Sequence, residues 1–371
     1  MVLNYLCHSF DAMKTVANFS PGPSQIYLTV EDHVRSAFRE GIPSISHRSK
    51  QFEGLVAELK AGLKELMQLP DEYSIYFTAS ATETWERVIQ NLVAQRSHHY
   101  VNGAFSSRFA EISRQLGKVV TETRVPLGQG FAGSPATETA ELIALTHNET
   151  STGVMMPVDW MQQVRQANPG ALLSVDAVSS LPYPALPYAA FDNVFFSVQK
   201  GFGLPAGLGV WMVNDRCHER AEQLLKEGHA IGTYHNLPTY RQNGVKNQTP
   251  ETPNVLGIYL LGKVVKDFLA RGIKTLRQET DYKAAVLYQA LDQHPLISSF
   301  VQESGWRSKT VIVAETGEHT RKLAVYLAET GLIAGDGYGE LKKTQLRFAN
   351  FPAHSREQVE MLADRLMAFA G

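Results

Sequence analysis

The sequence predicts an α/β fold, in which helices cover both faces of a large, mostly parallel sheet and a smaller α+β part follows. Through roughly the first two thirds of the 371 residues, apolar strand-like runs alternate with amphipathic helical runs. Strand–helix–strand succession is typical of parallel sheets, because a crossover helix carries the chain back to the starting edge. After Val255 a long amphipathic helix introduces a second set of elements.

The first part opens with a helix between Ser49 and Gln68. Its apolar residues recur at helical spacing: Phe52, Leu55, Val56, Leu59, Leu63, Leu66 and Met67. The next elements, in order, are strand 74–78, helix 83–93, strand 98–102, helix 105–115, strands 118–125 and 142–149, helix 158–166, and strands 171–177, 194–200 and 209–213. Together they predict the large sheet and its helices.

The second part begins with the amphipathic helix 254–272. It continues with strand 309–315, helix 319–331, strand 344–351 and a terminal helix from Ser355. Because single cores rarely grow beyond about 250–300 residues, the length favours two domains. We predict a large domain over 20–265, and a small domain over 266–371 that also includes the N-terminal segment 1–19. The boundary falls between Val255 and Asp281.

Composition narrows the function classes. An apolar fraction of 44% and a charged fraction of 19% are typical of a folded globular protein, and a net charge of −2 gives no reason to expect nucleic acid or a membrane surface as partner. No apolar run approaches the roughly 20 residues that span a bilayer. The two cysteines, Cys7 and Cys217, lie far apart in no metal-ligand pattern. We therefore expect no metal site, no signal peptide and a cytoplasmic location.

Polar residues close two apolar strands of the predicted sheet. Asp176 ends the run 171–177, and Gln199-Lys200 end the run 194–200. Functional groups of open α/β sheets gather at the carboxyl ends of the strands. A lysine in an apolar mouth loses its proton readily, which suits Schiff-base chemistry.

The lysine and the aspartate together indicate a pyridoxal-phosphate site. This cofactor binds a lysine as a Schiff base and needs a carboxylate that keeps its pyridine nitrogen protonated. We predict these roles for Lys200 and Asp176. Taken singly, Lys200 also fits a solvated loop and Asp176 a helix cap or turn, but their shared context weakens both alternatives.

A phosphate group requires backbone N–H groups at the start of a helix. Ser80, Ala81 and Thr82 lie where strand 74–78 gives way to a helix, and their small side chains let the backbone approach an anion. An ordinary N-cap with Glu83 in the first turn explains this segment nearly as well.

Four further residues are candidates for contacts with the cofactor or the substrate. Phe105 follows a strand end and can stack on a flat ring, although a bare phenylalanine is more often core. Thr150 can donate towards the phenolic oxygen of the ring, whereas NETSTG also fits a simple turn. Arg347, on an apolar strand, matches a carboxylate, and burial without a partner would be costly. Arg48, which follows His47, is a candidate for the same kind of contact, although it also fits an ordinary surface ion pair.

These residues lie in segments that resemble the phosphoserine aminotransferase family, which belongs to the class V pyridoxal-phosphate enzymes. The resemblance covers nearly the whole chain. The matching segments are NFSPGP (18–23), SHR (46–48), NET (148–150), VDAVSS around Asp176, QKGFGLPAGL around Lys200, QTPETP (248–253) and LRFANFPA around Arg347. It implies a fold-type I transferase that moves an amino group between glutamate and a 3-phosphooxy-2-oxo acid.

The resemblance also implies a role for each candidate. Lys200 is the Schiff-base lysine and proton shuttle, and Asp176 is the partner of the pyridine nitrogen. The implied cofactor contacts are Ser80, Ala81, Thr82 and Gln199 around the phosphate, Phe105 stacked on the ring, Thr150 at the phenolic oxygen, and Gln248 and Thr249 from the neighbouring subunit of a homodimer. The implied substrate contacts are Arg347 for the α-carboxylate, and His47, Arg48, Lys342 and Lys343 for the substrate's phosphate.

Two departures leave a rival substrate open. The ASAT loop (79–82) resembles that of alanine–glyoxylate and serine–pyruvate aminotransferases, and Lys342-Lys343 stand where the family often has His-Arg. The rival is therefore a transaminase for a small unphosphorylated amino acid. A cysteine desulfurase is disfavoured because neither cysteine lies in a suitable segment. A non-catalytic cofactor-binding regulator is disfavoured because Lys200, Asp176 and Arg347 occur together.

The resemblance begins near Lys14, just after Met13, and residues 1–12 match nothing. We hypothesise that they are a disposable extension or reflect the choice of start codon. Mass spectrometry of native protein and the activity of a chain starting at Met13 distinguish these possibilities.

Overall fold

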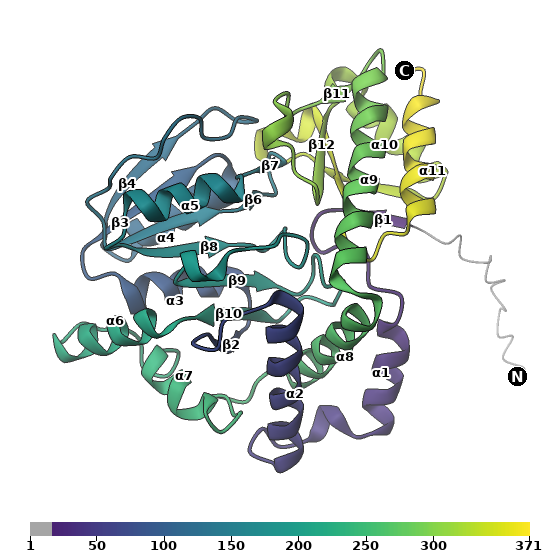
Figure 1. Ribbon diagram of the computed structural model, residues 1–371. Helices are drawn as coiled ribbons and strands as arrows, with labels where there is room; N and C mark the ends of the chain where they lie inside the picture. The colour runs from purple at the N-terminus through teal and green to yellow at the C-terminus, as the bar shows by residue number, and fades with distance from the viewer. Residues whose placement is uncertain (1–16) are drawn as a thin grey trace, which may run out of the picture.

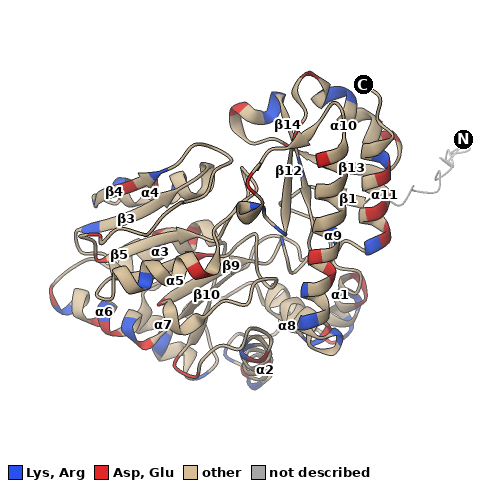
Figure 2. Ribbon diagram, turned by 45° about the horizontal axis from the view of Figure 1, so that its top comes forward, with Lys and Arg blue, Asp and Glu red and all other residues tan. Residues whose placement is uncertain are grey.

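The computed structural model describes residues 17–371 and arranges them around two main sheets (Figure 1). The hypothesis about residues 1–12 lies outside this range. Within it, no helix is both long and apolar enough to cross a membrane. Helices α6, α9 and α11 carry many of the charged residues on the outside of the molecule (Figure 2).

The larger sheet confirms the predicted mostly parallel architecture. Its strands are β2 (Ser74–Thr78), β3 (Arg96–Val101), β4 (Val119–Arg124), β5 (Leu142–Thr146), β8 (Leu172–Asp176), β9 (Asn193–Ser197) and β10 (Gly209–Val213). They lie in the order β2-β10-β9-β8-β5-β3-β4. Strand β10 is antiparallel to both of its neighbours, and the other described pairs of this sheet are parallel.

Helices cover both faces of this sheet. One face packs against α3 (Ala81–Leu92), α4 (Ala104–Gln115), α6 (Asp215–Lys226) and α7 (Leu237–Gly244). The other packs against α1 (Val30–Arg39), α2 (Lys50–Met67), α5 (Val158–Ala167) and α8 (Val255–Arg271). Both faces need this cover because both carry apolar side chains. In strand β9, Phe195 belongs to one core, whereas Val194 and Phe196 belong to the other, since successive strand residues point to opposite faces.

The smaller sheet has the order β1-β13-β14-β12-β11. Its strands are β1 (Ala17–Phe19), β11 (Ser298–Ser299), β12 (Val311–Glu315), β13 (Leu332–Asp336) and β14 (Gln345–Ala349), and a separate short pair is formed by β6 (Asn148–Glu149) and β7 (Val154–Met155). Its core includes residues of α9 (Ile273–Gln293), α10 (Thr320–Glu329) and α11 (Arg356–Met367). Strand β1 joins it in parallel with β13, pairing Ala17 with Leu332.

The domain limits stay a prediction. The boundary at 265/266 falls inside α8, which packs in the core of the larger sheet through Phe268. Helix α9 starts in that core with Leu276 and continues in the small core with Leu287 (Figure 1). We propose that the two domains meet along α9.

Candidate active site

A cavity of about 100 Å³ lies at the carboxyl ends of the central parallel strands. It opens where β5, β8 and β9 end at Thr146, Asp176 and Ser197. Its lining comprises Ser80, Ala81, Thr82, Trp85, Phe105, Thr146, Asn148, Thr150, Asp176, Val178, Ser197, Gln199 and Lys200. Eight of the sequence-predicted residues are thus brought together, although they come from distant parts of the chain.

Lys200 is the one amine in this lining. Its Nζ donates a hydrogen bond to Thr150 Oγ1 at 3.0 Å and lies 5.2 Å from the centre of the Phe105 ring. Burial lowers the pKa of Lys200 to about 8; the Asp176 carboxylate opposes this shift and Arg347 adds to it. The lysine can therefore lose its proton near neutral pH, as a nucleophilic or basic amine must.

Gly22, in the NFSPGP segment, packs directly against the side chain of Lys200. A Cβ on Gly22 would lie 2.9 Å from Lys200 Cε, and its φ of +157° is one that residues with side chains rarely adopt. The segment therefore packs directly on the lysine stem and limits how far the amine can move.

Asp176 is almost completely buried, and both of its carboxylate oxygens accept a hydrogen bond. The Val178 N–H donates to Oδ1 at 2.9 Å, and Trp85 Nε1 donates to Oδ2 at 2.8 Å. Burial raises the pKa of Asp176 to about 6, against the lowering effects of Val178, Trp85 and Lys200. The side chain therefore remains ionised above about pH 6 and can face a protonated ring nitrogen.

Helix α3 begins at the edge of the cavity. Its N-cap is Ser80, whose Oγ accepts the Glu83 N–H, while the Ala81 N–H donates to Ser197 Oγ at 2.8 Å. Thr82 in the first turn is exposed. A Cβ on Gly209 would lie 2.3 Å from Thr78 Oγ1 and 2.7 Å from the Ser80 carbonyl carbon, so only glycine lets β10 pack against this turn. The result is a helix start aimed at the cavity, which favours an anion.

A charged cluster lies behind this helix start. Glu83 Oε1 lies 2.5 Å from His235 Nδ1 and 3.4 Å from Arg87 Nε. His235 Nε2 lies 3.1 Å from Glu251 Oε2. Burial alone lowers the pKa of His235, but Glu251 and Glu83 outweigh it and raise the pKa to about 9. The positive charges of His235 and Arg87 thus neutralise Glu83, so a phosphate at the helix start would not meet an unpaired carboxylate.

Arg347 lies on β14 at the rim of the site. Its Nε donates to the Asp336 carbonyl at 2.6 Å, and Nη1 donates to the Thr150 carbonyl at 3.1 Å. Its guanidinium carbon lies 5.6 Å from the centre of the Tyr338 ring. The Tyr338 ring packs 5.0 Å from that of Phe105. The strand β14 of the smaller sheet and the segment before it therefore contribute a positioned cation and an aromatic wall.

The other predicted residues do not line the cavity of this chain. Arg48 Nη1 donates to Asn243 Oδ1, Gln248 Oε1 and the Thr249 carbonyl at 2.8–3.2 Å. His47 Nδ1 lies 3.4 Å from Thr252 Oγ1. These residues form one cluster with the 248–253 segment. The exposed Lys342 and Lys343 end the 3-10 helix Gly339–Lys343, which precedes β14.

The sequence interpretation did not include Trp85, Asn148, Tyr338 or His235. Trp85 follows Ala81 by one helical turn, so helical spacing alone places it on the same side of α3 as the helix start. Tyr338 stands between two glycines shortly before Arg347. Asn148 opens the NET segment, two residues before Thr150. His235 carries no comparable local pattern, because only the fold places it near the site.

The cavity fits pyridoxal phosphate. It contains a buried amine, a buried carboxylate, an aromatic ring and a helix start, which are the groups needed to bind an aldehyde, a pyridine nitrogen, a flat ring and a phosphate. Among the described residues, Asn148 Oδ1 is buried in this lining without a hydrogen-bond partner, so the cavity has an acceptor left for a ligand.

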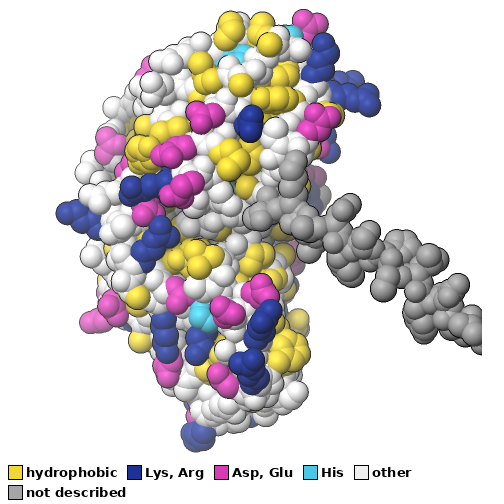
Figure 3. Space-filling model, turned by 90° about the vertical axis from the view of Figure 1, so that its right-hand side faces the viewer, with side chains coloured by type: hydrophobic (Ala, Val, Ile, Leu, Met, Phe, Trp, Pro, Cys, Tyr) yellow, Lys and Arg dark blue, Asp and Glu magenta, His cyan; other side chains and the backbone are white. Residues whose placement is uncertain are grey.

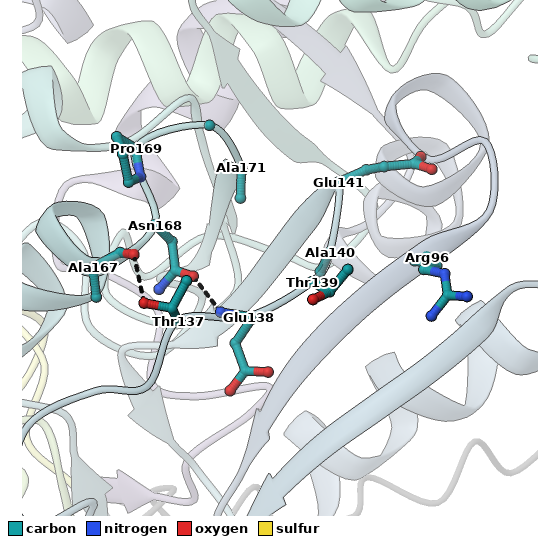
Figure 4. A pocket seen from close by; sticks show the side chains of 11 residues that line it. Arg96, Thr137, Glu138, Thr139, Ala140, Glu141, Ala167, Asn168, Pro169 and Ala171 are labelled. Carbon is teal, nitrogen blue, oxygen red and sulfur yellow. Dashed lines mark hydrogen bonds between the residues drawn. The ribbon is translucent and has the colours of Figure 1, made fainter.

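A second hollow lies at the opposite, amino-terminal edge of the large sheet (Figure 4). There Thr137 Oγ1 donates to the Ala167 carbonyl and Asn168 Oδ1 accepts the Glu138 N–H. The Asn168 side-chain amide also donates to two carbonyls, those of Ala136 and Val164. These contacts tie one loop to another, so we interpret this hollow as loop packing.

The fold and the site define a pyridoxal-phosphate-dependent transferase of fold type I. The chain belongs to the aminotransferase class-V family, whose model matches residues 16–339. It is a pyridoxal-phosphate-dependent aminotransferase.

Relatives and solved structures agree with this family. The chain is 30% identical to the phosphoserine aminotransferase of Corynebacterium glutamicum, over 93% of this chain and 92% of that one. It is 29% identical to that of a Nocardioides species, over 95% of each. A crystal structure of a phosphoserine aminotransferase from Cytophaga hutchinsonii shares 46% identity, covers 97% of this chain and 100% of that one, and superposes with a TM-score of 0.94.

Proposed function

We propose that the enzyme transfers an amino group between glutamate and 3-phosphohydroxypyruvate, giving O-phosphoserine and 2-oxoglutarate. The observation that carries this proposal is the 46% identity, over almost the full length of both chains, with a structure described as a phosphoserine aminotransferase. The curated relatives bear the same description at 29–30% identity. The site geometry is compatible with the reaction, since an amine and a carboxylate line one cavity and an arginine lies at its rim.

We assign the cofactor roles as follows. The ring of pyridoxal phosphate, when bound, withdraws electrons from the substrate carbon that loses its proton. Asp176 holds the proton on the ring nitrogen. Thr150 donates to the phenolic oxygen, and Phe105 packs on the ring face. Ser80, Ala81, Thr82 and Gln199, which line the cavity, would hold the phosphate.

Lys200 is the group that moves protons at the substrate carbon. Its Nζ is buried and positioned by Thr150, and its lowered pKa lets the free amine accept a proton near neutral pH. Arg347 binds the α-carboxylate. Two of its donor groups are fixed by carbonyl oxygens, which orients the remaining N–H groups before substrate arrives.

Among the described residues that line the cavity, Lys200 has the one cationic side chain. The substrate's phosphate therefore needs cations from outside this lining. Lys342 and Lys343 are exposed on the segment that leads to Arg347, so they can approach from the small domain. We assign His47 and Arg48 to the same phosphate, reaching the site from a second subunit.

We further propose a homodimer in which each site is completed by its partner. Gln248 and Thr249 cluster with Arg48 in this chain and do not line its cavity, while Thr82 at the helix start is exposed. A loop from the partner would cover the exposed helix start. The face shown in Figure 3 carries hydrophobic side chains only in small groups between charged ones, so we expect the interface elsewhere, near the 234–249 segment, where Tyr234 and Val245 are exposed.

Subunit complementation tests the dimer. Lys200→Ala chains and chains carrying Gln248→Ala with Thr249→Ala should each be nearly inactive alone. Refolded together, they should regain roughly a quarter of wild-type activity, because half of the dimers are mixed and each mixed dimer has one intact site. Mixed dimers that are detected by native mass spectrometry but have no activity would contradict the shared site.

The substrate is tested by single-turnover absorbance of the cofactor-loaded enzyme with O-phosphoserine, and with alanine and serine as controls. We expect phosphoserine to convert the cofactor to its amine form at least about tenfold faster than either control, because several cations meet its phosphate. Faster conversion by alanine or serine would favour the alanine–glyoxylate type, and would leave the assignments of Lys200 and Asp176 intact.

A cytoplasmic location is part of this proposal. Cys217, the cysteine within the described residues, is buried and free, and burial raises the pKa of its thiol. Such a thiol is structural and unreactive, which is compatible with a reducing compartment.

A further inference from the structure

We propose that Trp85 is a positioning residue, which fixes the Asp176 carboxylate against the ring nitrogen of the cofactor and couples that contact to the phosphate-binding start of helix α3. The inference rests on the proposed roles of Asp176 and of the Ser80–Thr82 turn. It assigns a function to an indole that otherwise belongs to the core.

The hydrogen-bond geometry carries the inference. Trp85 Nε1 donates to Asp176 Oδ2 at 2.8 Å, and the Val178 N–H donates to Oδ1 at 2.9 Å. A carboxylate with a donor on each oxygen has a fixed plane and a fixed rotation about its Cβ–Cγ bond. A protonated ring nitrogen has a single N–H, which points in one direction. The orientation of the carboxylate therefore decides whether its oxygen can accept that hydrogen bond.

The indole itself is held rigidly. Trp85 is 4% exposed, and its ring stacks on that of Phe109 at 5.7 Å with an interplanar angle of 16°. Phe109 is in turn held edge-on by His99 and Phe195, at 5.1 and 6.1 Å. The direction of the Trp85 N–H is therefore set by packing before any ligand binds.

One helix connects the two anchors of the cofactor. Ala81 in the first turn of α3 and Trp85 one turn later lie on the same side of the helix, and both line the cavity. The helix start would bind the phosphate, and the indole holds the group that meets the ring nitrogen. Helix α3 thus sets the distance between the two ends of the bound cofactor.

The Trp85 contact also affects charge. Asp176 is buried, and each N–H donor stabilises its ionised form against the cost of burial. Without the indole N–H, Oδ2 would lose this partner, and the carboxylate would become a better proton acceptor. A proton would then move from the ring nitrogen towards Asp176, and the cofactor would withdraw electrons less strongly.

The test compares Trp85→Phe with Trp211→Phe. Trp211 is a matched control, because it is fully buried in the same core and its Nε1 also donates a hydrogen bond, to Asn193 Oδ1 at 3.3 Å, outside the cavity. The holoenzyme of each variant is prepared, and three quantities are measured: the dissociation constant of pyridoxal phosphate, the pH at which the visible absorbance of the bound cofactor changes, and kcat.

We expect Trp85→Phe to weaken cofactor binding about tenfold, to shift the spectral midpoint by about one pH unit, and to lower kcat about tenfold, which matches the loss of one hydrogen bond to a charged group. Trp211→Phe should change each quantity less than about twofold, although both variants lose thermal stability. Equal cofactor affinity and equal spectral midpoints in the two variants would overturn the proposal.

A second replacement covers the case in which Trp85→Phe does not fold. β-(3-benzothienyl)alanine at position 85 exchanges the indole N–H for sulfur at nearly unchanged shape, so the packing on Phe109 is retained. The same spectral shift is expected, and its absence would show that Trp85 acts through packing alone. Because cofactor affinity is read without substrate, the outcome does not depend on whether phosphoserine is the substrate.

Discussion

Lys200→Ala should lower turnover by at least about 10³-fold and remove the visible absorbance of the lysine-bound cofactor. Among the described residues that line the cavity, Lys200 is the one with an amine. Its replacement therefore removes covalent attachment of the cofactor and proton transfer together. Absorbance spectra and steady-state rates of the purified variant measure these two effects.

Lys118→Ala is the matched control for this variant. Lys118 is only partly buried, but like Lys200 it has a pKa lowered by burial, and its Nζ donates to the Ala94 carbonyl, outside the cavity lining. It should retain the absorbance and the turnover of the wild type. A Lys200→Ala enzyme with a normal spectrum and normal turnover would refute the central assignment of this site.

Asp176→Asn should lower kcat by roughly 10²–10⁴-fold, while the protein still folds. A neutral amide cannot hold a proton on the ring nitrogen, so the bound cofactor loses much of its power to withdraw electrons. The variant should still bind pyridoxal phosphate covalently through Lys200. A kcat within tenfold of the wild type would contradict the role of Asp176.

The same variant should change how the stability of the cofactor-free protein depends on pH. The pKa of Asp176 is raised from 3.8 to about 6 in the folded state, so ionisation of this buried group costs stability above that range. Well below pH 3.8 the side chain is neutral in both states and the cost vanishes. Relative to wild type, Asp176→Asn should therefore gain up to about 3 kcal/mol in unfolding free energy between pH 4 and pH 7. Urea titrations of both proteins across this range measure the difference, and a difference that stays constant with pH would contradict it.

Most of the fold could be predicted because it follows from periodicity. The helix between Ser49 and Gln68 and the strand ending at Asp176 each have a clear apolar pattern, and the structure has elements there. The strand predicted over 194–200 is also present, but it ends at Ser197, and Lys200 lies in the turn that follows. Strand β1 could not be predicted in its place. Three residues carry no periodicity, and their pairing with β13 depends on the assembled fold.

The site was predictable where one residue type at a strand end is needed for the chemistry, as with Lys200 and Asp176. It was not predictable where the role depends on a contact between distant elements. In the sequence, Trp85 is an aromatic residue at helical spacing, which is the pattern of any core position. Only the fold brings its N–H to Asp176. The assignments of individual residues remain proposals that the variants above test.

The position of β1 has a consequence for how the chain folds during synthesis. Strand β1 leaves the ribosome long before its partner β13, because most of the described elements lie between them in the chain. The seven-stranded sheet can form while β1 is unpaired, and β1 can join the small sheet only after β13 has emerged. Until then, the backbone N–H and C=O groups of β1 lack their partner strand, and an unpaired strand can pair with another chain.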